Sequence, residues 1–223
     1  MILHIETATG NCSVSVSDDE QILATVELNE GFTHAEHLHP FIEQALQQAN
    51  LKPTQLNAVA VSAGPGSYTG LRIGLSAAKG LCYALNIPLI SVSTLQSLSA
   101  GAVKFVEKED ALLCPMLDAR RMEVYTAMFD RELNEIKKTE PKIMDENSIK
   151  EFDKGKTIYF FGDGVPKCKE LLEKIRGSKF IEGFVPSSKH MIAIALKKYS
   201  DQQFEDVAYF EPFYLKEYFF KTK

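Results

Sequence analysis

The part of the chain best suited to hold an anion is the glycine-rich segment at residues 64–74, which reads Gly-Pro-Gly-Ser-Tyr-Thr-Gly-Leu-Arg-Ile-Gly. Gly66 and Gly70 allow backbone conformations closed to other residues, and free N–H groups at a helix start can receive a phosphate. Ser67 adds a hydroxyl and Arg72 a permanent positive charge. The segment matches neither a Walker loop nor the Gly-x-Gly-x-x-Gly fingerprint. A tight turn into a helix with Ser67 or Thr69 as N-cap is the alternative, and spacing alone favours it.

ATP hydrolysis would need carboxylates at strand ends to hold magnesium and water. Glu6 and Asp118 stand at the ends of two apolar, strand-like runs, and Thr7 follows the first of them. The connection at residues 8–12 has one glycine and that at residues 119–122 has none, so both are poor phosphate cradles. Asp118 has arginines in the turn after it and could pair with one of them instead. Nucleotide contact through Glu6, Thr7, Gly66, Ser67, Arg72 and Asp118 is therefore the weaker hypothesis.

Three histidines, His34, His37 and His39, lie within six residues, but no glutamate stands between them in the His-Glu-x-x-His order of metalloproteases. A solvated helix start is favoured over a metal site, and we expect none. No nucleophile has a visible base partner, so we expect no catalytic residues. The four cysteines are widely spaced, which disfavours both a disulfide framework and a cysteine zinc site.

The residues named above lie on or next to predicted strands and helices, which follow a definite order in the first half of the chain. Three short β-type runs precede a helix, after which strands and helices alternate. The predicted strands lie at residues 2–7, 12–17, 21–28, 57–63 and 88–92, and the predicted helices at residues 33–48, 70–85 and 94–106.

The second half repeats this order without repeating the residues. The predicted strands lie at residues 111–118, 122–129, 132–140, 157–161 and 179–181, and the predicted helices at residues 146–152, 166–176 and 188–199. A duplicated β-β-β-α-β-α-β-α unit with mixed sheets is the plan of the actin, sugar-kinase and chaperone-ATPase superfamily. The sequence therefore predicts an α/β protein with two such domains, 1–106 and 107–223.

The helix at residues 70–85 is apolar on two sides. One stripe suits its own sheet, and a second stripe of small residues (Ile73, Ala77, Gly80 and Ala84) lies on the other side. A helix that is apolar all round is usually buried on both sides. Pattern alone leaves two interpretations open, namely burial by another helix of the domain or close docking of another chain.

Composition limits the remaining classes of protein. The 223 residues are 45% hydrophobic and carry a net charge of −5, which argues against binding nucleic acid by bulk electrostatics. No apolar run is long enough for a membrane span, and the chain enters a strand-like run at Ile2 without a signal peptide. With the cysteine spacing, these features predict a cytoplasmic protein that does not contact membranes.

The glycine-rich segment resembles that of the TsaB family, also called YeaZ, and other blocks extend the resemblance almost end to end. These blocks are residues 5–9, 34–40, 77–80, 118–125 and 212–216. The chain departs from the family pattern at Glu6, where Asp is usual, at Ala35 and His39, and at Lys216, where Arg is usual. The segment at residues 218–223 matches nothing we can name.

The resemblance implies the same two-domain fold and an accessory role in tRNA threonylcarbamoyladenosine synthesis. The implied partners are the ATPase TsaE and the catalytic subunit TsaD, which docks on the N-terminal domain. The resemblance also implies self-association through that docking surface, and contact with tRNA only through the complex. TsaD-like metal binding would need a His-x-x-x-His pair, but the residue four after His34 is Leu38. No cofactor of its own is implied, while ATP or ADP could bind at the level of the complex.

The hypothesis that follows is a non-catalytic scaffold subunit for threonylcarbamoyl transfer to the adenosine next to the anticodon of ANN-decoding tRNAs. We expect its partner surface on the helices at residues 33–48 and 70–85, at His34, His37, Phe41, Ile73, Ala77, Gly80 and Ala84. An ATP-dependent phosphotransferase or hydrolase of the same superfamily is the alternative, and a glycoprotease-type peptidase is a third possibility.

Overall fold

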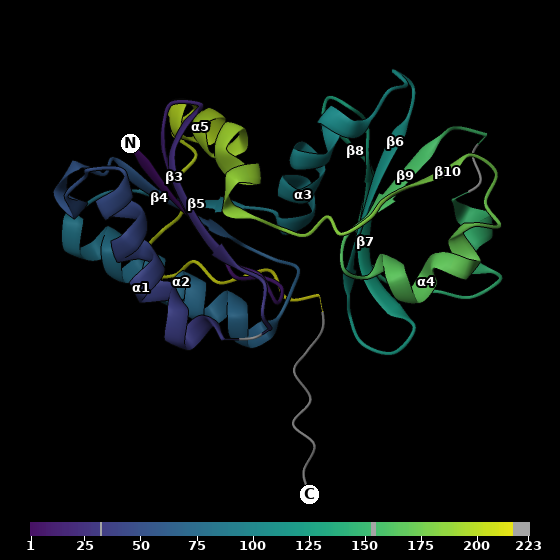
Figure 1. The fold of residues 1–223 in the computed structure, drawn as a ribbon, viewed down its shortest axis with the longest axis horizontal. Helices are drawn as coiled ribbons and strands as arrows, with labels where there is room; N and C mark the ends of the chain where they lie inside the picture. Colours follow the sequence, from purple (N-terminus) through teal and green to yellow (C-terminus); the bar gives the residue numbers. More distant parts are fainter. Residues whose placement is uncertain (32, 153–154, 216–223) are drawn as a thin grey trace, which may run out of the picture.

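Two five-stranded mixed sheets form the framework of the molecule (Figure 1). The structure is a computed structural model that describes residues 1–31, 33–152 and 155–215. The strand order is β3-β2-β1-β4-β5 in the first sheet and β8-β7-β6-β9-β10 in the second. Each strand therefore has a counterpart at the same place in the other sheet, which confirms the predicted duplicated unit. None of the helices among these residues is long and apolar enough to cross a membrane.

The first sheet is built from the predicted runs with shifts of a few residues. Its strands β1 and β4 are buried along their whole length, as continuous apolar runs at a sheet centre should be. The elements are β1 Ile2–Glu6, β2 Cys12–Asp18, β3 Gln21–Leu28, α1 His34–Gln48, β4 Ala58–Ser62, α2 Tyr68–Leu85, β5 Leu89–Val92 and α3 Thr94–Ala102, with 3-10 turns at Pro53–Gln55 and Val103–Phe105.

The second half follows the same order, but its first helix is reduced to one 3-10 turn, η3. The side chain of Asp145 accepts hydrogen bonds from the backbone of Asn147 and Ser148, which starts a local turn in place of the predicted helix at residues 146–152. The elements are β6 Leu112–Asp118, β7 Glu123–Phe129, β8 Glu135–Ile143, η3 Ser148–Glu151, β9 Ile158–Phe161, α4 Val165–Leu172, β10 Ser178–Ile181, η4 Ser188–Met191 and α5 Ile192–Ser200.

The last helix of each half packs on the sheet of the other half. Leu95 and Leu98 of α3 share a buried cluster with Leu113 and Phe161 of the second sheet. Ala195 of α5 instead packs with core residues of β1, β4 and β5. Figure 1 shows α5 over the first sheet and α3 next to the second. The two halves are therefore joined by exchanged helices, and the boundary at residue 106 stays a prediction.

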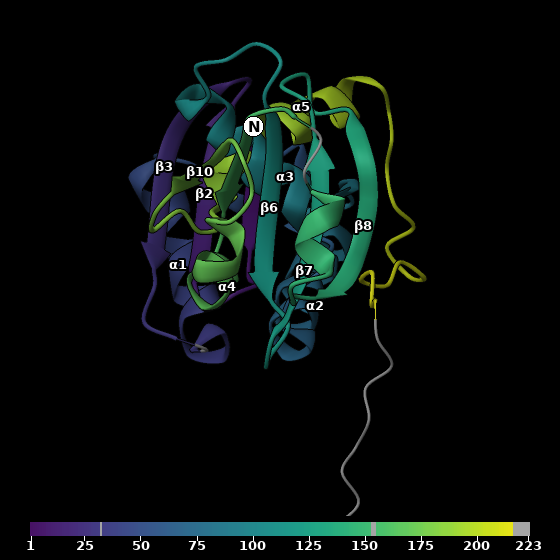
Figure 2. The ribbon, with the colours of Figure 1, turned by 90° about the vertical axis from the view of Figure 1, so that its right-hand side faces the viewer.

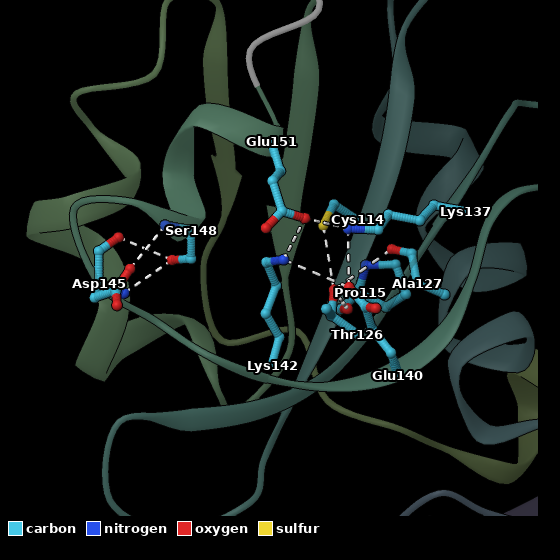
Figure 3. A network of polar contacts seen from close by, with 10 residues as sticks. All are labelled: Cys114, Pro115, Thr126, Ala127, Lys137, Glu140, Lys142, Asp145, Ser148 and Glu151. Carbon is cyan, nitrogen blue, oxygen red and sulfur yellow. Dashed lines mark hydrogen bonds and ion pairs between the residues drawn. The ribbon is translucent and has the colours of Figure 1, made fainter.

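A charged network lies where the second half lacks a counterpart of α1 (Figure 3). The ammonium groups of Lys137 and Lys142 lie 2.9 and 2.7 Å from Glu151 Oε2, and both lie over the ring of Phe152 at 5.7 and 5.5 Å. Lys142 and Lys137 lower the pKa of Glu151 to about 2. Among the described residues, only the first half therefore has two neighbouring helices like α1 and α2.

Candidate functional site

A shallow groove of about 640 Å³ runs between α1 and α2 on the outer face of the first half. Helix α2 rests on the sheet through Leu71, Ala78 and Cys82, which are at most 1% exposed, and so turns its opposite side outward. Most of the lining surface is apolar. It consists of Ala35, His39, Ile42, Tyr68, Thr69, Arg72, Ile73, Ser76, Ala77, Gly80 and Leu81.

The small-residue stripe of α2 forms one wall of this groove. Ile73, Ala77 and Gly80 line it, and Ala84 is exposed on the next turn. A Cβ at Gly80 would meet no atom within 4 Å, whereas Ala77 is only 7% exposed. The prediction that this stripe lies opposite the sheet-facing one is therefore confirmed, and α1 covers part of it without filling the groove.

The three residues expected on α1 behave differently from one another. His34 is 2% exposed and its Nε2 lies 2.7 Å from the carbonyl oxygen of Thr9. Burial lowers the pKa of His34. The expectation that His34 faces a partner is thus corrected, because its ring is used to tie α1 to the β1–β2 turn. His37 and Phe41 are half-buried and stack on each other at 5.5 Å, and neither of them lines the groove.

The glycine-rich segment holds α2 against the β1–β2 turn. A Cβ at Gly66, Gly70 or Gly74 would come within 3.0 Å of Ala8 or Thr7, so a larger residue would push the helix away. Ser67 accepts a hydrogen bond from the N–H of Gly70 at 3.2 Å and is the N-cap of α2. Its own N–H donates to the Ala8 carbonyl at 2.7 Å. The turn interpretation is confirmed, and the N–H groups of Ser67 and Gly70 are already bonded within the protein.

Glu6 and Thr7 are fully buried rather than open to a cleft. The Glu6 carboxylate accepts a hydrogen bond from the N–H of Ala8 at 2.7 Å, while its other oxygen has no partner in the described structure. Burial raises the pKa of Glu6 to about 7, although hydrogen bonds from Ala8 and Ser62 oppose the rise. In this conformation neither side chain is exposed to solvent.

Asp118 lies at the end of β6 and bonds within the second half. One of its oxygens accepts from Lys167 Nζ at 2.5 Å and from the N–H of Arg120 at 2.7 Å. The turn after Asp118 therefore pairs with it through the backbone of Arg120, not through a guanidinium. These bonds hold Asp118 in its own half, and the structure does not bring it together with Glu6 in one set of hydrogen bonds.

Arg72 lies at the rim of the groove, where sequence reasoning missed a neighbour. Its guanidinium is stacked over the ring of Tyr68 at 4.3 Å, and its Nε donates to the Tyr214 hydroxyl at 3.1 Å. Tyr214 belongs to a block that marked the family resemblance, yet no local pattern could place it beside α2. Lys216 of the same block lies outside the described residues.

The part of the chain that the structure describes contains neither a cluster of metal ligands nor a reactive cysteine thiol. There is no group of three or more metal-ligating side chains there. All four cysteines are buried and free, and burial raises the pKa of Cys12 and of Cys82 to about 11. Such thiols are poor nucleophiles at neutral pH, because the thiolate is the reactive form.

Comparisons with known proteins agree with this arrangement. Residues 23–216 match the family model described as TsaD, tRNA N6-adenosine threonylcarbamoyltransferase. The tRNA threonylcarbamoyladenosine biosynthesis protein TsaB of Escherichia coli is 32% identical over 224 residues, which span 96% of this chain and 94% of that one. TsaB of Bacillus subtilis is 30% identical over 192 residues, 82% of this chain and 79% of that one.

Solved structures show the same fold. YeaZ from Pseudomonas aeruginosa superposes with a TM-score of 0.78 at 22% identity, over 96% of this chain and 99% of that one. An activator of the 2-hydroxyisocaproyl-CoA dehydratase from Clostridium difficile, solved with bound ADPNP, has a TM-score of 0.52 at 10% identity, over 92% and 98%. The fold is thus the duplicated actin-like one, and by sequence this chain belongs to the TsaB family of tRNA threonylcarbamoyladenosine biosynthesis proteins.

Proposed function

We propose that this chain is a non-catalytic scaffold subunit that acts with TsaD and TsaE. Together they would transfer a threonylcarbamoyl group to the adenosine next to the anticodon of ANN-decoding tRNAs. The observation that carries the proposal is the open groove between α1 and α2, with Ile73, Ala77 and Gly80 on one wall. Small residues let a second helix approach closely, so this face suits another chain better than a soluble ligand.

The state of the expected nucleotide residues supports a role without catalysis. The Glu6 carboxyl is buried against the Ala8 backbone, and Asp118 is paired with Lys167. Ser67 caps α2, and Gly66 lies against the β1–β2 turn. Phosphoryl transfer depends on carboxylates that hold magnesium at the reacting phosphates. Glu6 is fully buried, and Asp118, although exposed, is paired with Lys167. The scaffold proposal therefore has more support than the ATP-dependent alternative.

The same face would serve two kinds of assembly. We place TsaD on the α1–α2 groove, and a second copy of this chain on the same groove when TsaD is absent. TsaE would join the pair, and tRNA would contact the complex chiefly through the partner, because this chain has a net charge of −5. ATP or ADP would bind at the level of the complex, and the assembly would work in the cytoplasm.

Substitution of Gly80 by arginine tests the docking surface. A Cβ at Gly80 would meet no atom within 4 Å and residue 80 is exposed, so Gly80→Arg should fold while its side chain extends over the groove. We expect it to abolish co-purification with TsaD of the same organism. Gln44→Arg is the matched control, because residue 44 is exposed and lies roughly opposite Ala35 around α1. Undiminished binding by Gly80→Arg would refute the assignment of the surface.

Reconstitution tests the scaffold role. This chain, TsaD, TsaE, tRNA and threonylcarbamoyl-adenylate are combined, and each is omitted in turn. Transfer that proceeds equally well without this chain would contradict the proposal. A steady-state ATPase assay on the isolated chain tests the alternative: turnover that disappears in a Glu6→Gln, Asp118→Asn double variant would show that the chain is itself an enzyme.

A further inference from the structure

An extended segment at residues 205–215, here called the C-terminal strap, is attached along its length to the first half. The N–H of Glu205 donates to Leu89 at 2.9 Å, and the N–H of Phe213 donates to Ala63 at 2.7 Å. Between them, Lys79 of α2 donates to the Ala208 carbonyl at 3.1 Å. Figure 1 shows the strap (yellow) passing α2, and Figure 2 shows it descending beyond the edge of the second sheet beside β8.

The strap ends by placing Tyr214 against α2 at the rim of the groove. The Tyr214 ring lies 4.9 Å from that of Tyr68, and the Arg72 guanidinium lies 4.3 Å from the Tyr68 ring and 5.8 Å from the Tyr214 ring. The hydrogen bond from Arg72 Nε to the Tyr214 hydroxyl, at 3.1 Å, adds a directional contact. Two aromatic rings and one hydroxyl thus restrict a side chain that would otherwise move freely on an exposed helix turn.

The charge of Arg72 stands out in its surroundings. It is the residue of the groove lining that carries a permanent charge, and no carboxylate of the described residues lies within 4.0 Å of it. Glu211 acts on it only at longer range. An apolar partner laid over the groove would remove water from the guanidinium, which is costly unless the partner supplies an acceptor. We therefore expect the partner to carry a carboxylate next to the apolar surface that covers the groove.

We propose that the C-terminal strap is part of the docking surface and that Tyr214 is a positioning residue for Arg72. It orients the guanidinium toward a carboxylate on the docked helix of TsaD, next to the small residues that fill the groove. The inference rests on the proposed function and adds the strap to it. The docking face is accordingly made from two segments far apart in the sequence, because α2 supplies the cation and the strap supplies the group that holds it.

A double-mutant cycle on the full chain tests this coupling. Dissociation constants for purified TsaD are measured by calorimetry for wild type, Tyr214→Ala, Arg72→Met and the double variant. Because Tyr214 acts through Arg72, we expect Tyr214→Ala to weaken binding about tenfold in wild type and by less than about twofold in the Arg72→Met background. Tyr214→Phe keeps the ring and should recover part of the loss.

Controls separate this inference from the proposed function. Tyr209→Ala removes another strap tyrosine, which is 84% exposed, and should leave the affinity unchanged. Thermal melts check that each variant is folded. Equal losses from Tyr214→Ala in both backgrounds, or no loss in wild type, would overturn the inference while Gly80→Arg still abolishes binding. If Gly80→Arg instead binds TsaD as tightly as wild type does, the docking surface itself is refuted.

Discussion

The Glu6→Gln variant should change how the stability of the fold depends on pH. Glu6 is 0% exposed, and one of its carboxyl oxygens has no hydrogen-bond partner in the described structure. Burial disfavours the ionised form and raises the pKa of Glu6 from 4.5 to about 7. Glutamine keeps an oxygen that can accept from the N–H of Ala8, but it has no charge to desolvate. The substitution therefore removes one titration and keeps the shape.

The sign and size follow from proton linkage. Between pH 4.5 and 7 the unfolded chain has lost the Glu6 proton while the folded chain retains it, so stability falls as pH rises. One pKa unit corresponds to about 1.4 kcal/mol, so the total fall is about 3 kcal/mol and is complete above pH 7. The free energy of unfolding of Glu6→Gln minus that of wild type should increase by this amount over the same range.

Urea denaturation at several pH values between 4.5 and 8 measures this difference. A constant offset from the amide cancels, because only the change with pH is used. Burial also lowers the pKa of His4 to about 3, but His4 titrates in both proteins and its effect cancels in the difference. A difference that stays flat across the range would refute the reasoning that Glu6 is protonated in the folded chain.

Glu27→Gln gives an internal comparison of opposite sign. Burial alone would raise the pKa of Glu27, but hydrogen bonds from Lys189 and Ser187 outweigh it and lower the pKa. The folded carboxylate therefore stabilises the protein above the unfolded pKa, and this contribution is lost as pH falls through the lower folded pKa. The urea series, extended below pH 4.5, should show the stability difference between wild type and Glu27→Gln shrinking toward acid pH.

Four further substitutions test how α2 and the link between the halves are held. Gly70→Ala should prevent folding or destabilise the fold by about 3 kcal/mol or more, because its Cβ would overlap the Thr7 carbonyl. Gly80→Ala should instead stabilise the fold by about 0.5–1 kcal/mol, because alanine has the higher helix propensity. Urea denaturation midpoints distinguish the two outcomes. Ser67→Ala should cost about 1 kcal/mol in the same assay, because it removes the N-cap. Ser188→Ala should cost about 1–3 kcal/mol, because the buried hydroxyls that bond it across the halves lose a partner.

Features with a local cause were predictable from the sequence. The period of apolar residues predicted the element order in both halves, and a capping hydroxyl, Ser67 or Thr69, was expected before α2. Ser67 supplies it. The sheet-facing stripe of α2, including Cys82, was predicted from helical spacing and is buried as expected. The helix expected at residues 146–152 failed because side-chain bonds of Asp145 favour a single turn there.

The candidate site was only half predictable. The groove side of α2 followed from its small residues, since a second apolar stripe must meet something. Burial of His34 did not follow, because its partner, the carbonyl of Thr9, lies 25 residues away. The position of Tyr214 beside Arg72 depends on the course of the chain over 142 residues, and no periodicity records that course.

The sequence by itself determined the class of this protein: the duplicated order of strands and helices, and the motif blocks that mark the TsaB family. Both depend on short-range pattern, which each segment carries independently of its neighbours. Only the tertiary structure decided that α3 and α5 each pack on the sheet of the other half. The same holds for the close packing of α2 against the β1–β2 turn and for the contact of the strap with Arg72 at the groove. These outcomes depend on contacts between distant segments, whose geometry is set when the whole chain packs.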